Sequence, residues 1–168
     1  MALATRMVLR MGIQKVGTQK EAARRINYSD EMLCKVLAGE RNLAPDVAPR
    51  LARLHTMIGQ AIAEEATGYN CFSYIDGDRH PQTMLRRVEK EDWEADEALK
   101  KLPWLLIDKR GPEDLTPDDR ILMQKAGREV CDRIKVDLNF VVEMDDCFKL
   151  ELIDYLLEKE RATIKAAR

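Results

Sequence analysis

Apolar residues recur three and four positions apart along most of this 168-residue chain, and the apolar–polar alternation typical of β-strands is nearly absent. Such a period places the apolar side chains of each segment on one helix face, which another helix must then cover. Only 5% of the residues are aromatic, so the covered faces are mainly aliphatic, as in helical bundles. The sequence therefore predicts an all-α fold with almost no sheet.

The N-terminal stretch predicts two helices with a tight connection between them. A first helix over about residues 3 to 15 ends before Gly17, which suits a C-terminal cap. Thr18 and Glu21 then have the spacing of a capping box, so a second helix begins at Gln19. The inward side of the first helix is expected to carry Val8 and Met11.

A cramped turn follows the second helix. That helix is expected to stop near Ile26, because Asn27 is one of the few residues other than glycine that tolerate the left-handed conformation. Ser29 is the predicted N-cap of a third helix over residues 30 to 37, and Gly39 ends it. Its inward side is expected to carry Leu33 and Val36.

This pair of short helices resembles the helix-turn-helix of phage-repressor-like (Xre-type) regulators. The likeness rests on Ala23 at the fifth position of the second helix, on the turn at Asn27, and on Leu33 and Val36 at fixed offsets beyond it. It covers roughly residues 5 to 60. The resemblance implies that the second helix crosses the backbone of double-stranded DNA while the third helix lies in the major groove.

The same resemblance implies roles for individual residues. Helix N-termini attract phosphate, so Gln19 and Lys20 are expected to anchor the DNA backbone. Arg41 and Asn42 form a second expected anchor in the loop after the third helix. Base edges would be met from the third helix. The complete set of expected DNA-binding residues is Thr18, Gln19, Lys20, Ser29, Asp30, Glu31, Met32, Lys35, Arg41 and Asn42.

Two acidic residues depart from this family pattern, because Asp30 and Glu31 stand where amides such as glutamine are common. Carboxylates repel phosphates, but they can accept a hydrogen bond from the N4 amino group of cytosine. One interpretation is that the pair reads C·G steps. The alternative is that both charges complement the positive end of the helix dipole.

The charge of the chain is unevenly distributed. Residues 1–60 hold 10 Lys and Arg against 5 Asp and Glu, whereas residues 61–168 hold 18 against 25. A net positive N-terminal region is compatible with binding to phosphates.

The rest of the chain predicts further helices in a second unit. One helix is expected from about residue 46 to 67, followed by a turn-rich linker over residues 68–83 in which His80 is a turn residue. Residues 84–168 form the predicted association domain, with a helix that ends or kinks at Pro103, a long helix after the Thr116-Pro117 pair, and a final helix. That final helix carries Leu150, Ile153, Leu156 and Leu157. The predicted DNA-binding domain is residues 1–67, and dimerisation through the second domain would present two recognition helices to a two-fold site.

Several classes of site are not indicated. The four cysteines contain no C-x-x-C pair and the chain has two histidines, so we expect neither a disulfide framework nor a metal site, and no cofactor. There is no run of eighteen apolar residues, and arginines at positions 6 and 10 interrupt the N-terminus, so no membrane span or secretory peptide is predicted. The expected location is the cytosol.

Two other functions are compatible with the sequence. Glu94-x-x-Glu97 and Glu129-x-x-Asp132 resemble the paired acidic motifs of all-α nucleotide pyrophosphohydrolases, which implies four carboxylates holding magnesium against a nucleoside triphosphate. The other alternative is a protein–protein interaction module that retains a residual helix-turn-helix and uses the acidic region as its contact surface.

Overall fold

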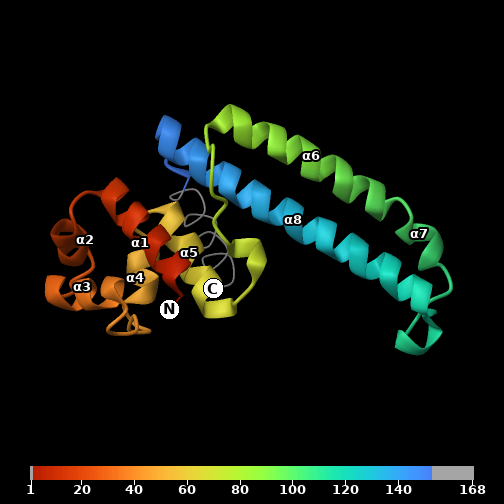
Figure 1. Cartoon of the computed structure of the whole chain (residues 1–168), viewed down its shortest axis with the longest axis horizontal. Coiled ribbons are helices and arrows are strands. Elements are labelled where there is room, and N and C mark those ends of the chain that lie inside the picture. The colour runs from red at the N-terminus through yellow and green to blue at the C-terminus, as the bar shows by residue number, and fades with distance from the viewer. Residues whose placement is uncertain (1, 153–168) are drawn as a thin grey trace, which may run out of the picture. The chain divides into compact units, whose positions relative to one another are not determined.

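The computed structural model describes residues 2–152, and every regular element in that range is helical (Figure 1). The predicted all-α fold is confirmed. Contacts divide the described chain into two units, the first formed by residues 2–74 together with residues 141–152, and the second by residues 75–140. None of the described helices is both long and apolar enough to cross a membrane.

The first unit is a small bundle around one aliphatic core. Its elements are α1 (Leu3–Val16), α2 (Gln19–Arg25), α3 (Asp30–Ala38), α4 (Ala48–Ala52), α5 (Thr56–Thr67) and the short 3-10 helix η1 (Asn70–Phe72). Helices α1 and α5 pack closely, since a Cβ atom on Gly12 would lie 2.5 Å from Cγ1 of Ile58. The core side chains include Leu9, Ile13, Ala22, Ala23, Leu33, Leu51, Met57, Ile58 and Val142.

Most of the predicted inward positions of this unit are correct, with one exception. Val8 on α1 and Leu33 and Val36 on α3 are buried, as their spacing predicts. The prediction that Met11 faces inward is wrong, because 37% of this residue is exposed and Gly12 makes the contact with α5 instead. Close approach of the two helix backbones decided which side of α1 faces inward.

The prediction of a single helix over residues 46 to 67 is also wrong, because this segment forms two helices. α4 ends at Ala52 and α5 begins at Thr56. Between them His55 has an extended backbone (φ −164°, ψ 142°), and its imidazole Nδ1 accepts a hydrogen bond from the Met57 amide at 3.2 Å. The histidine thus serves as the N-cap of α5, which an uninterrupted helix would not need.

The same histidine makes the stability of the first unit depend on pH. Burial lowers the pKa of His55 below its usual 6.5, with Lys149 and Lys15 acting in the same direction and Asp146 and Asp145 against it. The folded state therefore favours neutral imidazole, while the unfolded chain takes up a proton near pH 6.5. We expect the contribution of His55 to the free energy of unfolding to be complete above pH 6.5. This contribution should be lost as the pH falls through the lowered pKa.

Chemical denaturation between about pH 7.5 and pH 5 measures this effect, since most carboxylates titrate below that window. The matched control is His55→Asn, which keeps a capping acceptor but has no titrating group. The variant should lose the pH dependence in this window and keep most of the stability at pH 7.5. An identical pH dependence in the two proteins would contradict the prediction.

The second unit is a hairpin of two long antiparallel helices (Figure 1). Its elements are α6 (Pro81–Leu99), α7 (Leu102–Leu105), the 3-10 helix η2 (Pro112–Asp114) and the first part of α8 (Pro117–Phe148). The predicted start of α8 is confirmed: the Asp119 amide donates to Thr116 Oγ1 at 3.2 Å, and the Thr116 amide donates to Asp119 Oδ2 at 3.0 Å. His80 caps α6, accepting from the Gln82 amide at 3.2 Å.

The observed units differ from the predicted domain boundaries at two places. Asn139 of α8 is fully buried, and its Oδ1 accepts hydrogen bonds from the Ile75 amide and from Arg79 Nη1, each at 3.0 Å. These bonds tie the end of the expected linker to the second unit. Residues 141–152 belong to the first unit, where Val142 packs in its core. The final helix predicted at Leu150 to Leu157 lies mostly outside the described residues.

Candidate nucleic-acid interface

The start of α2 is fixed by a reciprocal cap. Thr18 Oγ1 accepts a hydrogen bond from the Glu21 amide at 3.2 Å, and the Thr18 amide donates to Glu21 Oε2 at 2.7 Å. The bond from the Thr18 amide is the main reason why the pKa of Glu21 lies below its usual value. The predicted capping box is therefore present, and it leaves Gln19 and Lys20 in the first turn of α2.

The connection between α2 and α3 depends on Asn27, which adopts the predicted left-handed conformation (φ 51°). The Tyr28 amide donates to the carbonyl of Ala23 at 2.9 Å, and Arg50 Nη1 donates to the carbonyl of Ile26 at 2.7 Å. Ser29 caps α3 as predicted, with Oγ accepting from the Met32 amide. Local capping and one long-range arginine contact thus determine the angle between the two helices.

The N-terminus of α2 is bonded directly to that of α3. Gln19 Nε2 donates to Asp30 Oδ1 at 2.8 Å and lies 3.3 Å from the Asp30 carbonyl oxygen. Both side chains belong to the predicted interface, and the structure brings them together. Because the carboxylate of Asp30 is already held by Gln19, it is suited to positioning the amide side chain at least as well as to accepting from a base.

Glu31 is also paired, in this case within α3. Lys35 Nζ lies 2.6 Å from Glu31 Oε1, four residues apart on one helix face. The hydrogen bond from Lys35 lowers the pKa of Glu31, and the same bond raises the pKa of Lys35. An exposed ion pair contributes little to stability, so exchange of either partner for a nucleic-acid group costs little.

The predicted backbone anchors lie in α2 and in the loop after α3. Lys20, Arg41 and Asn42 are exposed, as is Thr18. Arg41 Nη1 also lies 3.7 Å from the sulfur of Met32, which links the loop after α3 to the middle of the predicted interface. All ten predicted residues lie on α2, α3 or the segments that flank them.

The sequence interpretation missed the residues of α1 that hold α3 in place. Arg10 Nη2 donates to the carbonyl of Leu37 at 3.0 Å, and Arg6 Nη1 donates to that of Ala38 at 2.8 Å. These carbonyls belong to the last turn of α3, where a cation complements the helix dipole. The spacing of two arginines four residues apart on one face of α1 was the available signal. A cavity of about 420 Å³ lies beside them, lined by residues of α1, α2 and α3 that include Arg10, Gln14, Gln19 and Cys34.

The acidic residues of the alternative prediction lie in the second unit, but in a different grouping. Carboxylate oxygens of Glu91, Glu129 and Asp132 lie within 4.8 Å of one another. Glu97 instead forms an ion pair with Lys100. Sequence reasoning placed Glu129 and Asp132 together correctly and missed Glu91, which stands three residues before Glu94 and repeats its spacing.

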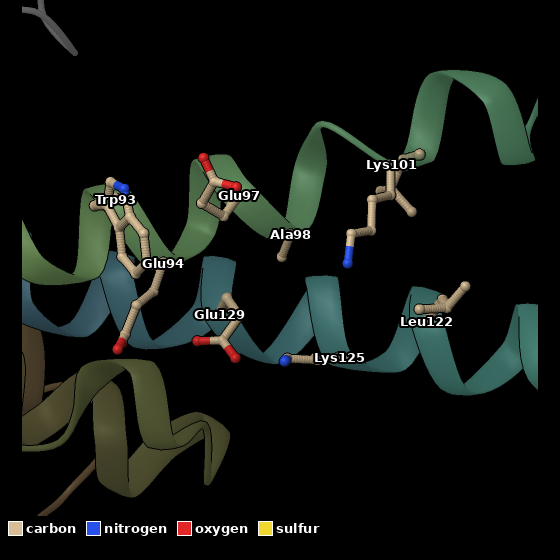
Figure 2. A pocket seen from close by; sticks show the side chains of 9 residues that line it. Trp93, Glu94, Glu97, Ala98, Lys101, Leu122, Lys125 and Glu129 are labelled. Atoms are coloured by element: carbon tan, nitrogen blue, oxygen red, sulfur yellow. The ribbon is translucent and has the colours of Figure 1, made fainter.

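Basic side chains offset this acidic cluster. Lys90 Nζ donates to Glu91 Oε1 and to Glu94 Oε2, each at 2.8 Å, and these bonds raise the pKa of Lys90. An adjoining cavity of about 290 Å³ is lined by both acidic and basic groups of α6 and α8 (Figure 2). In it, Lys125 extends from α8 near Glu129 (Figure 2). The surface is therefore mixed in charge.

Comparison of this chain with protein-family models, with curated proteins and with solved structures finds no match.

Proposed function

We propose that this chain is a sequence-specific DNA-binding regulator that works as a dimer on a two-fold site in the cytosol. The observation that supports the proposal is the α2–turn–α3 arrangement. Both helices are capped, Asn27 provides the left-handed turn, α3 exposes Asp30 and Glu31, and Lys20 and Arg41 are exposed on the neighbouring segments. In this proposal α3 enters the major groove and the N-terminus of α2 binds phosphate.

The proposal is tested first by selection of bound sequences from random duplexes. A palindromic product with two half-sites about one helical turn apart is the expected result, since each copy of the chain supplies one α3. Failure to enrich any sequence would contradict a sequence-specific role.

Lys20→Ala separates a phosphate contact from a base contact. We expect the variant to bind every duplex more weakly and to lower the slope of log affinity against log salt by about one per site, because one released counterion is lost. Lys125→Ala in the second unit is the matched control and should leave the slope unchanged. The measurement is a salt titration of binding to the selected duplex.

Glu31→Ala is expected to act differently. Binding to random DNA should stay equal or become tighter, because a charge that repels phosphate is removed. Discrimination at one cytosine should fall by about one to two orders of magnitude if Glu31 accepts from its N4 amino group. Titration of single-base variants of the selected site measures this, and a uniform loss across all variants would show that Glu31 is not a base reader.

The magnesium-dependent pyrophosphohydrolase alternative stays a prediction. Glu129 and Asp132 are close together as it requires, but Glu97 is bonded elsewhere and Lys90 neutralises part of the charge. Assay of nucleoside triphosphate hydrolysis with and without magnesium decides it, with Glu129→Gln as the variant. The interaction-module alternative would be favoured if the full chain bound no duplex at all.

A further inference from the structure

One flank of α8 in the second unit carries an apolar stripe that lies beside the surface facing α6. The facing surface is identified by Ala126, which is buried, and by Arg133, which lies 3.7 Å from Asp92 and 3.6 Å from Asp96 of α6. The stripe runs roughly 70° around the helix from there, as the helical repeat of 3.6 residues requires. It consists of Met123, Gly127, Val130 and Ile134.

This stripe is exposed at Gly127 and Ile134, whereas Met123 and Val130 are half-buried. Ile134 is 44% exposed, and a Cβ atom built on Gly127 would meet nothing within 4 Å. A glycine inside a 32-residue helix costs about 1 kcal/mol relative to alanine. The space above it, with apolar residues on both sides along the helix, suits close approach of another helix.

The α6–α8 hairpin has no further helix of its own that covers this flank of α8 in the described residues of the second unit. Two antiparallel helices contact each other along one face each, whereas the helices of a four-helix bundle have two neighbours roughly at right angles. In the described residues of the second unit, the buried positions are few. They are Pro81, Met84, Ala95, Ala126, Val136 and Asn139.

The two ends of the stripe carry opposite charges, so they are complementary when two copies of α8 pack in antiparallel directions. Arg120 lies one turn before Met123, and Asp137 lies one turn after Ile134. If a two-fold axis passed between Gly127 and Val130, Arg120 of each copy would lie opposite Asp137 of the other copy. The dimer would therefore contain two such pairs. The same axis sets Met123 against Ile134 and the open Gly127 against Val130.

An added cation beside Asp137 would offset its repulsion from Asp92. Burial and the charge of Asp92 raise the pKa of Asp137, whereas Arg133 opposes that shift. Arg133 is itself close to Asp92 and Asp96. Arg120 of a second copy has donors to offer, because the hydrogen bond to the Pro112 carbonyl uses one of its five N–H groups.

We propose that a second copy of this chain binds this flank through antiparallel packing of α8 against α8, so that two α6–α8 hairpins form a four-helix bundle. The inference rests on the proposed function only for its purpose, which is to present two α3 helices to one site. Self-association without DNA tests the dimer, so its failure can be distinguished from failure of DNA binding.

The first test is analytical ultracentrifugation of the full chain at tens of micromolar. Wild type should sediment as a dimer, and Ile134→Lys should raise the dissociation constant by about tenfold or more. Ile121→Lys is the matched control, because Ile121 is 62% exposed on the same helix but lies roughly 140° away. A monomeric wild type, or equal effects of the two lysine variants, would overturn the proposal.

The second test examines the register. Arg120→Asp and Asp137→Arg should each weaken the dimer, because like charges then face each other across the axis. The double variant should recover wild-type association, since the pairs are restored with reversed sign. Circular dichroism checks that each variant keeps its helical content. A double variant no better than the single ones would contradict the antiparallel arrangement.

Discussion

Replacing Leu33 by alanine is expected to lower the free energy of unfolding of the first unit by about 2–5 kcal/mol, the range for buried leucines in other proteins. Leu33 is fully buried, and it is a core side chain of the helix proposed to enter the groove. The loss combines the transfer energy of the removed carbons with the cavity they leave. Chemical denaturation followed by circular dichroism measures it as a lower midpoint.

Leu3→Ala is the matched control for this prediction. Leu3 is 68% exposed at the start of α1, so the same change of side chain removes little buried surface. Its effect should stay within about 0.5 kcal/mol of wild type. Equal losses in the two variants would show that α3 is not held to the core through Leu33. DNA binding should weaken in Leu33→Ala in proportion to the unfolded fraction.

Gly12→Ala is expected to destabilise the first unit by about 1–3 kcal/mol, although alanine has the higher helix propensity. The added Cβ atom would lie 2.5 Å from Cγ1 and 3.3 Å from the backbone nitrogen of Ile58, which is fully buried. Helices α1 and α5 would have to move apart. Because protein interiors are closely packed, this movement would weaken other contacts in the core.

Gly59→Ala provides the comparison on the partner helix. A Cβ atom there would meet the Ala52 carbonyl oxygen at 3.4 Å, an ordinary contact, so the gain in helix propensity should dominate. We expect a small stabilisation for Gly59→Ala and a clear loss for Gly12→Ala in the same denaturation experiment. Stabilisation by both substitutions would mean that α1 and α5 do not pack as closely as described.

Much of the predicted interface depends on interactions between residues a few positions apart. The Thr18–Glu21 capping box, the left-handed turn at Asn27 and the Ser29 cap were all predictable, because each is settled by local backbone chemistry. The pairing of Glu31 with Lys35 follows from the four-residue spacing on one helix face. The bond from Gln19 to Asp30 was not predicted, because it joins two helices.

Interactions between distant parts of the chain decided the features of the first unit that the sequence did not predict. Helical periodicity could not show that Gly12 rather than Met11 faces α5, since that depends on how closely two helix backbones approach. Nor could it show that the helix expected over residues 46 to 67 is broken at His55. Both features belong to the assembled first unit.

The sequence by itself determined the all-α class, the ends of α2 and α3, and the start of α8 at Thr116 and Pro117, because capping and turn geometry require only near neighbours. Only the tertiary structure decided that Arg6 and Arg10 hold the end of α3 and that Glu91 joins Glu129 and Asp132. It also assigned residues 141–152 to the first unit. Such contacts depend on packing between residues tens of positions apart, and a periodic pattern carries no information about which faces meet.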